Sequence, residues 1–320
     1  MKNDHFTFTA TDGAQLFVYR WRPDVEIGKA VIHIAHGLAE HAGRYERLAE
    51  ELTSQGYLVY ANDHRGHGKT AGSNDNLGFC GERNCWNRMV QDLIELCAAE
   101  KRENPSLRLT LFGHSMGSAM AQQAICEDPA PMDQPGVFDA VVMSGANGTV
   151  SPLVHLGKII ARIERLRLGA RGRSNLINSL SFDNFNKPFA PNRTAFDWLS
   201  RDEREVDRYI ADPLCGFIAS VQFWVDFLAA LPEIARTDNR RRIRPTLPIY
   251  LFSGGDDPVN ENARGCEALA RAYREIGLKN ISYKIYPYAR HETLNELNRD
   301  QVVADFVDWL EAVRMLARAA

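Results

Sequence analysis

The chain lacks the features that mark a membrane-spanning or nucleic-acid-binding protein. No apolar run reaches the length of about 18 residues that a membrane-spanning helix needs. The first residues, MKNDHFTFTATDG, include no apolar core of a signal peptide. An excess of one sign of charge is also lacking, since 38 Lys and Arg stand against 41 Asp and Glu, for a net charge of −3. We therefore expect a cytoplasmic protein with no nucleic-acid partner.

Cysteine is scarce, and its spacing matches no common metal or redox pattern. The six cysteines include no Cys-x-x-Cys pair, and Cys97 and Cys126 fall on apolar faces of expected helices. The sequence therefore predicts buried free thiols rather than a disulfide or a zinc site, and no cofactor or metal. The full set is Cys80, Cys85, Cys97, Cys126, Cys215 and Cys266.

Strand and helix patterns alternate along much of the chain. Residues 6–9 and 15–21 alternate in polarity around Asp12-Gly13, as an antiparallel hairpin does. Further strands are predicted at 30–35, 58–62, 108–112, 140–144, 247–253 and 281–286, and helices at 44–55, 86–103 and 118–126, with a last helix that has Val302, Val303, Phe306, Leu310 and Val313 on one face. This order predicts an α/β fold with a mostly parallel sheet and helices on both faces.

One short segment points to chemistry. Residues 108–117 read RLTLFGHSMG, an apolar run that ends in Gly113-His-Ser115-Met-Gly117. This is the G-x-S-x-G pattern, in which a sharp turn from strand to helix exposes a nucleophilic serine. The turn is so tight that the flanking positions must lack a side chain, as the two glycines do. Ser115 is therefore the candidate nucleophile of a serine hydrolase, and a glycine-bracketed turn with an idle serine is the structural alternative.

The order of residues along the chain selects the partners of Ser115. In this arrangement the acid follows the serine and the histidine follows the acid. Seven of the nine histidines precede Ser115, and His155 follows it too closely for a strand and an acid to intervene, so His291 is the candidate base. The strand before it ends in an acidic pair, of which Asp257 is the candidate because a residue before proline is held extended. Asp256 is the alternative, and whichever carboxylate does not bond the histidine is expected to cap the turn or the next helix.

These residues define a mechanism for ester cleavage. His291 takes the proton of Ser115 during attack on an ester carbonyl, and Asp257 orients the imidazole and stabilises its protonated form. The developing oxyanion needs donors that do not move. We expect them to be the backbone N–H of Met116, at the start of a helix, and that of Leu38, in the loop after the strand at 30–35.

The alternation of strands and helices breaks after residue 148. The following stretch is polar, rich in arginine and dotted with aromatic residues, which is typical of a cap inserted over the active site. We therefore divide the chain into a first core part (1–148), a cap (149–245) and a second core part (246–320). Within the cap, residues 158–173 carry six basic residues against Glu164, interleaved with Ile and Leu. A solvated helix is one interpretation, and peripheral contact with anionic lipid surfaces is the other.

Several segments together identify a family. They are His36-Gly-Leu-Ala-Glu-His-Ala-Gly-Arg-Tyr45, Asp63-His-Arg-Gly-His-Gly68, Gly113 to Gly117, and Gly255-Asp-Asp-Pro-Val259 with His291. With them the chain resembles, over nearly its whole length, the monoacylglycerol lipase and lysophospholipase group of the α/β-hydrolase superfamily. The resemblance implies an α/β-hydrolase fold, oxyanion donors at Leu38 and Met116, and Asp257 as the acid, three residues after Gly254. Thr70 stands where many members have serine.

The resemblance also gives two other patterns a structural interpretation. Gly66-His-Gly-Lys-Thr70 ends like a phosphate-binding loop, but Asp63 stands where that loop needs a glycine. Asp63, His64 and His67 contain metal-ligand types, but in the family they form a structural loop beside the pocket.

The sequence thus predicts a serine carboxylic-ester hydrolase for a lipid-like monoester, such as a monoacylglycerol or lysophospholipid. An aminopeptidase or amidase with the same triad is the alternative enzyme. A ligand-binding receptor on a hydrolase scaffold is the alternative without catalysis.

Overall fold

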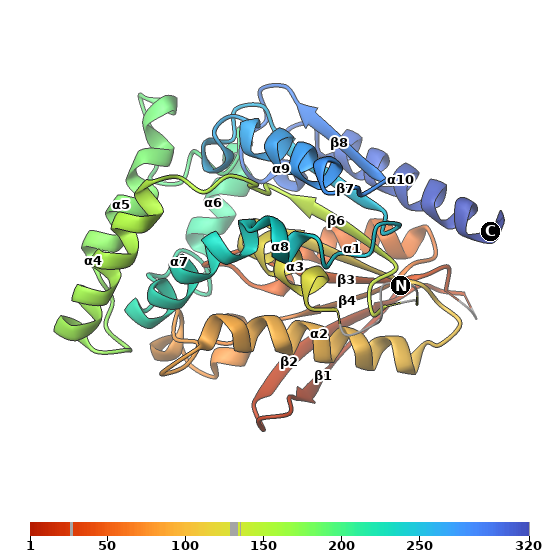
Figure 1. Cartoon of the computed structure of the whole chain (residues 1–320), viewed down its shortest axis with the longest axis horizontal. Helices are drawn as coiled ribbons and strands as arrows, with labels where there is room; N and C mark the ends of the chain where they lie inside the picture. Colours follow the sequence, from red (N-terminus) through yellow and green to blue (C-terminus); the bar gives the residue numbers. More distant parts are fainter. Residues whose placement is uncertain (26–27, 129–133, 135, 320) are drawn as a thin grey trace.

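The structure, a computed structural model, describes residues 1–25, 28–128, 134 and 136–319. It contains one eight-stranded sheet with the order β1-β2-β4-β3-β5-β6-β7-β8 (Figure 1). The strands are β1 (Lys2–Thr9), β2 (Gln15–Arg22), β3 (Val31–Ala35), β4 (Leu58–Asn62), β5 (Leu109–His114), β6 (Ala140–Ser144), β7 (Ile249–Gly254) and β8 (Ile281–Tyr286). Strand β2 pairs antiparallel with β1 and β4, and the pairs from β4 to β8 are parallel. The mostly parallel sheet predicted from the sequence is therefore confirmed.

Helices cover both faces of this sheet. They are α1 (Glu46–Ser54), α2 (Cys85–Glu103), α3 (Met116–Cys126), α9 (Arg264–Glu275) and α10 (Arg299–Ala319). Side chains of α2, α3 and α9 form one buried core with the sheet, and those of α1 and α10 form another. Strand β7 shows the division, since Ile249 and Leu251 join the first core while Tyr250 and Phe252 join the second. With both faces covered, the loops that leave the carboxyl ends of the strands gather at one edge, where a ligand can reach them.

Between β6 and β7 the described chain is helical and contributes no strand to the sheet. Its helices are α4 (Leu153–Leu168), α5 (Asn175–Asn186), α6 (Glu203–Ala211), α7 (Val221–Ala235) and α8 (Thr237–Arg240). We call residues 149–245 the helical segment. Helix α7 packs against α2 and α3, and α4 packs against α7, so that α4 and α5 lie on the left of the molecule in Figure 1. The break in alternation is as expected, and the assignment of this segment as a cap stays a prediction.

Within the described residues, none of the helices combines the length and the apolar character that crossing a membrane requires.

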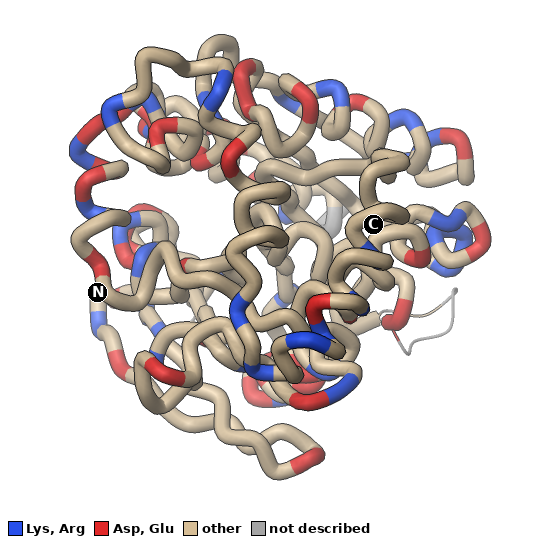
Figure 2. Tube along the Cα trace, turned by 90° about the vertical axis from the view of Figure 1, so that its left-hand side faces the viewer, with Lys and Arg blue, Asp and Glu red and all other residues tan. Residues whose placement is uncertain are grey.

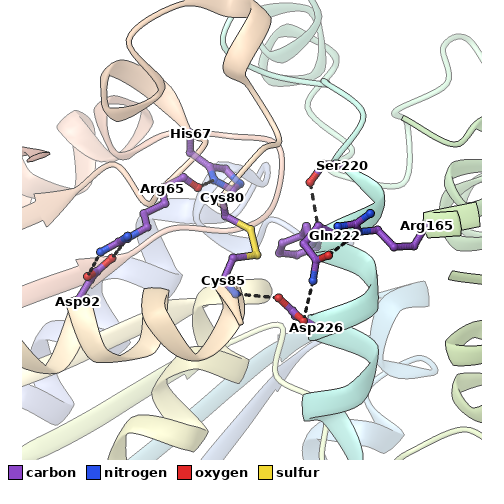
Figure 3. Close-up of a disulfide and its surroundings, with 10 residues drawn as sticks. Arg65, His67, Cys80, Cys85, Asp92, Arg165, Ser220, Gln222 and Asp226 are labelled. Carbon is purple, nitrogen blue, oxygen red and sulfur yellow. Dashed lines mark hydrogen bonds and ion pairs between the residues drawn. A yellow bond between two sulfur atoms is a disulfide. The ribbon is translucent and has the colours of Figure 1, made fainter. Parts of the chain in front are cut away.

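The cysteines depart from the prediction at one place. Cys80 and Cys85 form a disulfide with their Cα atoms 5.4 Å apart, whereas Cys97, Cys126, Cys215 and Cys266 are free. Free thiols were the wrong prediction for this pair, because the loop before α2 brings together two cysteines five positions apart. Figure 3 shows the bridge where this loop meets α7, and the Cys85 N–H donates to Asp226 there at 2.7 Å.

Candidate active site

Ser115 lies directly after β5 in a strained turn of the kind that the sequence predicts. Its φ of +52° and ψ of −114° lie outside the regions that residues with a side chain favour. A Cβ atom at Gly113 would lie 2.4 Å from the carbonyl oxygen of Gly117, and one at Gly117 would lie 2.0 Å from that of Ala35. Both positions therefore require glycine. The turn presents Ser115 at the carboxyl edge of the sheet, and α3 begins at the next residue.

Ser115, His291 and Asp257 form one hydrogen-bonded chain. The Oγ of Ser115 lies 2.8 Å from Nε2 of His291, and Nδ1 of His291 lies 2.9 and 3.0 Å from the two carboxylate oxygens of Asp257. Asp257 and His291 are buried, while Ser115 is partly exposed. The loops after β5, β7 and β8 thus bring together the three residues of the predicted triad. Their catalytic roles stay predictions.

The acidic pair differs in one respect from the expectation. Asp256 is exposed, and its backbone N–H donates to the carbonyl of Ala289 at 3.0 Å. Asp257 both bonds His291 and caps the following turn, because its Oδ1 accepts the N–H of Val259 at 2.9 Å. The expected division of these tasks between two carboxylates was therefore wrong, since one fully buried carboxylate has enough acceptor sites for both.

The carboxylates around His291 favour its protonated form. Burial alone would lower the pKa of this imidazole, but the charges of Asp257, Glu292 and Glu40 outweigh burial and raise the pKa above its usual value. The ring of His114 lies 4.9 Å from that of His291, and burial lowers the pKa of His114 to about 3. His114 is therefore neutral at neutral pH, and a proton taken up in this cluster is held by His291.

Leu38 and Met116 lie on segments that flank Ser115. Met116 is the first residue of α3, where backbone N–H groups carry partial positive charge. The loop of Leu38 is in contact with the nucleophile, because a Cβ atom at Gly37 would lie 3.3 Å from the Cβ of Ser115. Among the described residues, the hydrogen bonds of turns, loops and caps use the N–H of neither Leu38 nor Met116. Both groups are thus available to a ligand, and their role as oxyanion donors stays a prediction.

The helical segment contacts the histidine side of the site. The ring of Trp198 lies 5.3 Å from that of His291, and its carbonyl accepts the His291 N–H at 3.3 Å. Trp198 in turn packs with Phe182 and Phe185, at ring separations of 6.2 and 5.3 Å. We call these three residues the aromatic cluster. It places apolar surface beside the candidate base.

Two groups of side chains in the described residues have metal-ligand types close together, but their hydrogen bonding argues against a metal. They are His33, Cys97 and Glu100, and His41, Asp212 and Cys215. In the second group Nδ1 of His41 accepts the N–H of Gly43, so Nε2 carries the proton that it shares with Asp212 and has no lone pair for an ion. The first group is fully buried, and the carboxylate of Glu100 already pairs with His33 at 2.8 Å.

The loop after β4 is organised by one buried carboxylate. Asp63 accepts the N–H of Ala42 at 2.8 Å and that of Lys69 at 2.7 Å. A Cβ atom at Gly68 would lie 2.3 Å from this carboxylate, which explains a glycine there. Burial also lowers the pKa of the adjacent His67 to about 4, so this imidazole is neutral at neutral pH. These contacts agree with a structural loop.

An ion cluster beside His291 has no counterpart in the sequence predictions. Arg44 donates to Glu40 at 2.6 Å and to both carboxylate oxygens of Glu292 at 2.7 Å. The spacing of Glu40 and Arg44, four positions apart within the family segment, is a signal that could have suggested their pairing. Glu292 follows 248 residues after Arg44, and only the fold brings it there.

Comparison with known proteins gives the family. A family model described as serine aminopeptidase S33 matches residues 27–298, which is most of the chain. The chain belongs to this hydrolase family. It is 27% identical to the monoacylglycerol lipase of Mycolicibacterium smegmatis over 97% of each chain. It is also 30% identical to the monoglyceride lipase of Homo sapiens, over 89% of this chain and 82% of the human protein.

A solved structure gives the same answer for the fold. A highly thermostable carboxyl esterase from Bacillus coagulans superimposes with a TM-score of 0.88 at 23% identity, covering 98% of this chain and 99% of the esterase. The α/β-hydrolase fold predicted from the sequence is therefore confirmed. The family and the monoacylglycerol and monoglyceride lipases among its relatives identify the chain as an enzyme of the serine ester hydrolase type.

Proposed function

We propose that Ser115, His291 and Asp257 are a catalytic triad that hydrolyses a lipid-like monoester through an acyl-enzyme. The observation that carries the proposal is the unbroken chain of hydrogen bonds from the Ser115 hydroxyl to the buried Asp257 carboxylate. A serine hydroxyl is a weak nucleophile at neutral pH, and this arrangement is the one that activates it.

The proposed reaction runs in two halves. As Oγ of Ser115 attacks the ester carbonyl carbon, Nε2 of His291 takes the hydroxyl proton, and the N–H groups of Leu38 and Met116 hold the oxyanion. The ester C–O bond then breaks, the alcohol leaves with the proton from His291, and the acyl group stays on Ser115. A water molecule attacks this acyl-enzyme in the same manner, which releases the fatty acid and returns the proton to Ser115.

A monoacylglycerol is the substrate that the relatives support best. The proteins of M. smegmatis and H. sapiens are named monoacylglycerol and monoglyceride lipase. The aromatic cluster beside His291 offers an acyl chain the apolar surface that it needs. A lysophospholipid presents the same single acyl ester with a charged head group, and we include it as a second substrate.

Peptide-bond cleavage is the competing activity, because the matching family is described as a serine aminopeptidase. The same triad can attack an amide, so the choice depends on the groups that bind the substrate on either side of the reacting carbonyl.

The test combines active-site labelling with a substrate panel. A fluorophosphonate should modify Ser115 stoichiometrically, and Ser115→Ala should abolish labelling and lower kcat by about 10⁶-fold without loss of folding. In the panel, hydrolysis of a 1-monoacylglycerol should exceed that of a lysophosphatidylcholine and of an aminoacyl amide. Preferred cleavage of the amide would assign the chain to the peptidases. Labelling of another serine would show that the proposed triad is wrong.

We further propose that α4 and α5 bring the enzyme to an anionic lipid surface. Apolar side chains at intervals of three or four positions stand exposed on one side of α4, with Leu166 90% exposed. They are Leu153, Leu156, Ile159, Ile163 and Leu166, joined by Leu176 and Leu180 of α5. Figure 2 views the molecule from this side, on which both Lys/Arg and Asp/Glu positions are present. Helix α4 itself has four basic residues and one acid, which favours anionic lipid.

A further inference from the structure

Two side chains hold two consecutive peptide groups of this loop, and the second of these peptides carries the N–H of Leu38. Nδ1 of His36 donates to the carbonyl of Gly37 at 2.8 Å, and that carbonyl belongs to the same planar peptide as the Leu38 N–H. In a trans peptide the two groups point in opposite directions, so holding the carbonyl aims the N–H away from His36. The preceding N–H, that of Gly37, donates to Oε1 of Glu40 at 2.5 Å.

The Glu40 carboxylate is itself held in place. A Cβ atom at Gly37 would lie 2.7 Å from its Oε1, so the loop closes around it with no room to spare. Tyr45 donates to the same oxygen at 2.9 Å, and Ala39 has a left-handed φ of +57° between the two ends of the turn. The side chain of Glu40 is 4% exposed. A buried charge of this kind needs partners, and Arg44 supplies the strongest one.

Arg44 joins this loop to the loop of the candidate base. One of its amino groups donates to Glu40 and to Glu292, and the other completes a two-oxygen pairing with Glu292. Asn295 adds a hydrogen bond to Glu292 at 2.8 Å. Because Glu40 holds the N–H of Gly37, next to Leu38, and Glu292 directly follows His291, a single planar guanidinium links the loop of Leu38 to the loop of His291.

We propose that Glu40, Arg44 and Glu292 are positioning residues that set the oxyanion donor Leu38 and the base His291 relative to each other. The inference rests on the proposed function, since it assumes that Leu38 and His291 act on one substrate. The three side chains touch neither the substrate carbonyl nor Ser115, and they act through the two loops. Their loss is therefore expected to lower kcat while substrate binding is retained.

The first experiment separates kcat from KM. Glu40→Gln removes the charge that holds Arg44 and weakens the bond to Gly37, and kcat on a 1-monoacylglycerol should fall about 10- to 100-fold with KM within about threefold. Arg44→Lys keeps the charge but not the two-oxygen pairing, so its kcat should lie between wild type and Glu40→Gln. Asp92→Asn is the matched control, because Asp92 is another buried carboxylate, which pairs with Arg65 and Arg88 rather than with the loops of Leu38 and His291.

The second experiment uses the charge of the cluster. Two carboxylates and one guanidinium leave a net negative charge beside His291, whose other titratable neighbours are the charged Asp257 and the neutral His114. His291 must be unprotonated to act as a base, so activity is lost as the pH falls through its pKa. Glu292→Gln removes one of the charges that raise this pKa, and the acid limb of the kcat/KM profile should move to lower pH. Asp92→Asn, which removes a carboxylate outside the cluster, and Arg44→Lys, which keeps the charge, should leave the limb in place.

Two results would overturn the inference: a kcat for Glu40→Gln within threefold of wild type, or an acid limb that does not move in Glu292→Gln. If Glu40→Gln fails to fold, as judged by circular dichroism, the near-isosteric Glu292→Gln decides alone. Ser115→Ala keeps this outcome distinct from the proposed function. If Ser115→Ala is active, the proposed triad is wrong. If Ser115→Ala is inactive but the Glu40 and Glu292 variants behave like wild type, only the positioning role is wrong.

Discussion

The sheet edge and the helical segment form their parts of the site by different means. At the sheet edge the contacts are between backbones, and glycine is required where they are closest. A Cβ atom at Gly254 would lie 2.1 Å from the carbonyl oxygen of Ala289, and one at Gly145 would lie 2.9 Å from the ring of His291. The helical segment approaches the same histidine mainly with a side chain, the indole of Trp198, at a ring separation of 5.3 Å.

This difference indicates a division of labour, in which the sheet edge fixes the reacting groups and the helical segment shapes the surface beside them. Backbone contacts that leave no room for a Cβ atom fix the reacting groups and tolerate almost no exchange. Packed aromatic rings can be exchanged for other apolar side chains at moderate cost, which changes the shape of a pocket without disturbing the chemistry. We therefore expect substitutions at the sheet edge to abolish turnover, and substitutions in the helical segment to change selectivity.

Exchange of the acid is the severest test of the sheet edge. Asp257→Asn keeps the size of the side chain but favours the wrong tautomer of His291, and kcat should fall about 10,000-fold. Asp256→Asn is the matched control, because Asp256 is exposed and the structure uses its backbone N–H in the bond to Ala289. Steady-state hydrolysis of nitrophenyl butyrate measures both variants. The reverse ranking would transfer the role of the acid to Asp256.

The strands and the residues at the sheet edge are the parts of the molecule that the sequence could predict. The strands at 58–62 and 140–144 have the bounds expected from their apolar runs, because a strand that pairs on both sides in the core needs such residues throughout. The edge strand at 281–286 also has the expected bounds. The expected strand at 247–253 begins later, at Ile249, since Pro248 has no N–H to donate to a neighbouring strand. Ser115, Asp257 and His291 could be predicted as the triad because each follows a strand of the sheet. The G-x-S-x-G pattern and the order of the strands along the chain are visible in the sequence.

Pairings across the fold could not be predicted in this way. The stripe of Leu and Ile on α4 has the period of a helix, but periodicity does not tell what covers the stripe, and the structure leaves it exposed. Glu292 pairs with Arg44 across 248 residues, and neither residue carries a local signal for the other. The Cys80–Cys85 disulfide likewise depends on the path of one loop.

Acyl-chain selectivity tests the other half of the comparison. If the aromatic cluster binds the acyl chain, each added methylene contributes about 0.8 kcal/mol, so four more carbons raise kcat/KM by up to roughly 200-fold while room remains. For a series of nitrophenyl esters, kcat/KM should rise beyond four carbons and then level off or fall. Phe182→Ala and Phe185→Ala should flatten the rise. Phe79→Ala removes a comparable ring outside the helical segment and should not.

A profile that peaks at the acetyl ester and falls with each added carbon would mean a small pocket. The division of labour would then be wrong for the helical segment, and a short-chain esterase or a peptidase would replace the lipid substrate. A flattened rise with unchanged kcat for the acetyl ester would confine the effect of Phe182 and Phe185 to selectivity.

Contact with a lipid surface is the smallest effect that the comparison predicts, because the contacts to His291 described above come from Trp198 and not from α4. Ile159→Ser and Ile163→Ser together remove two exposed apolar side chains, and binding to vesicles with anionic lipid should weaken about 10-fold or more, since full burial of each contributes about 1.5–3 kcal/mol. Turnover of a short soluble ester should not change. Met315→Ser is the matched control, since Met315 is 63% exposed on α10, whose end lies opposite α4 in Figure 1. Flotation with vesicles of neutral and anionic composition measures the binding. Equal binding to neutral and anionic vesicles would mean that apolar contact alone holds the enzyme on the surface. If Met315→Ser weakened vesicle binding as much as the α4 variant does, α4 would not be the binding element.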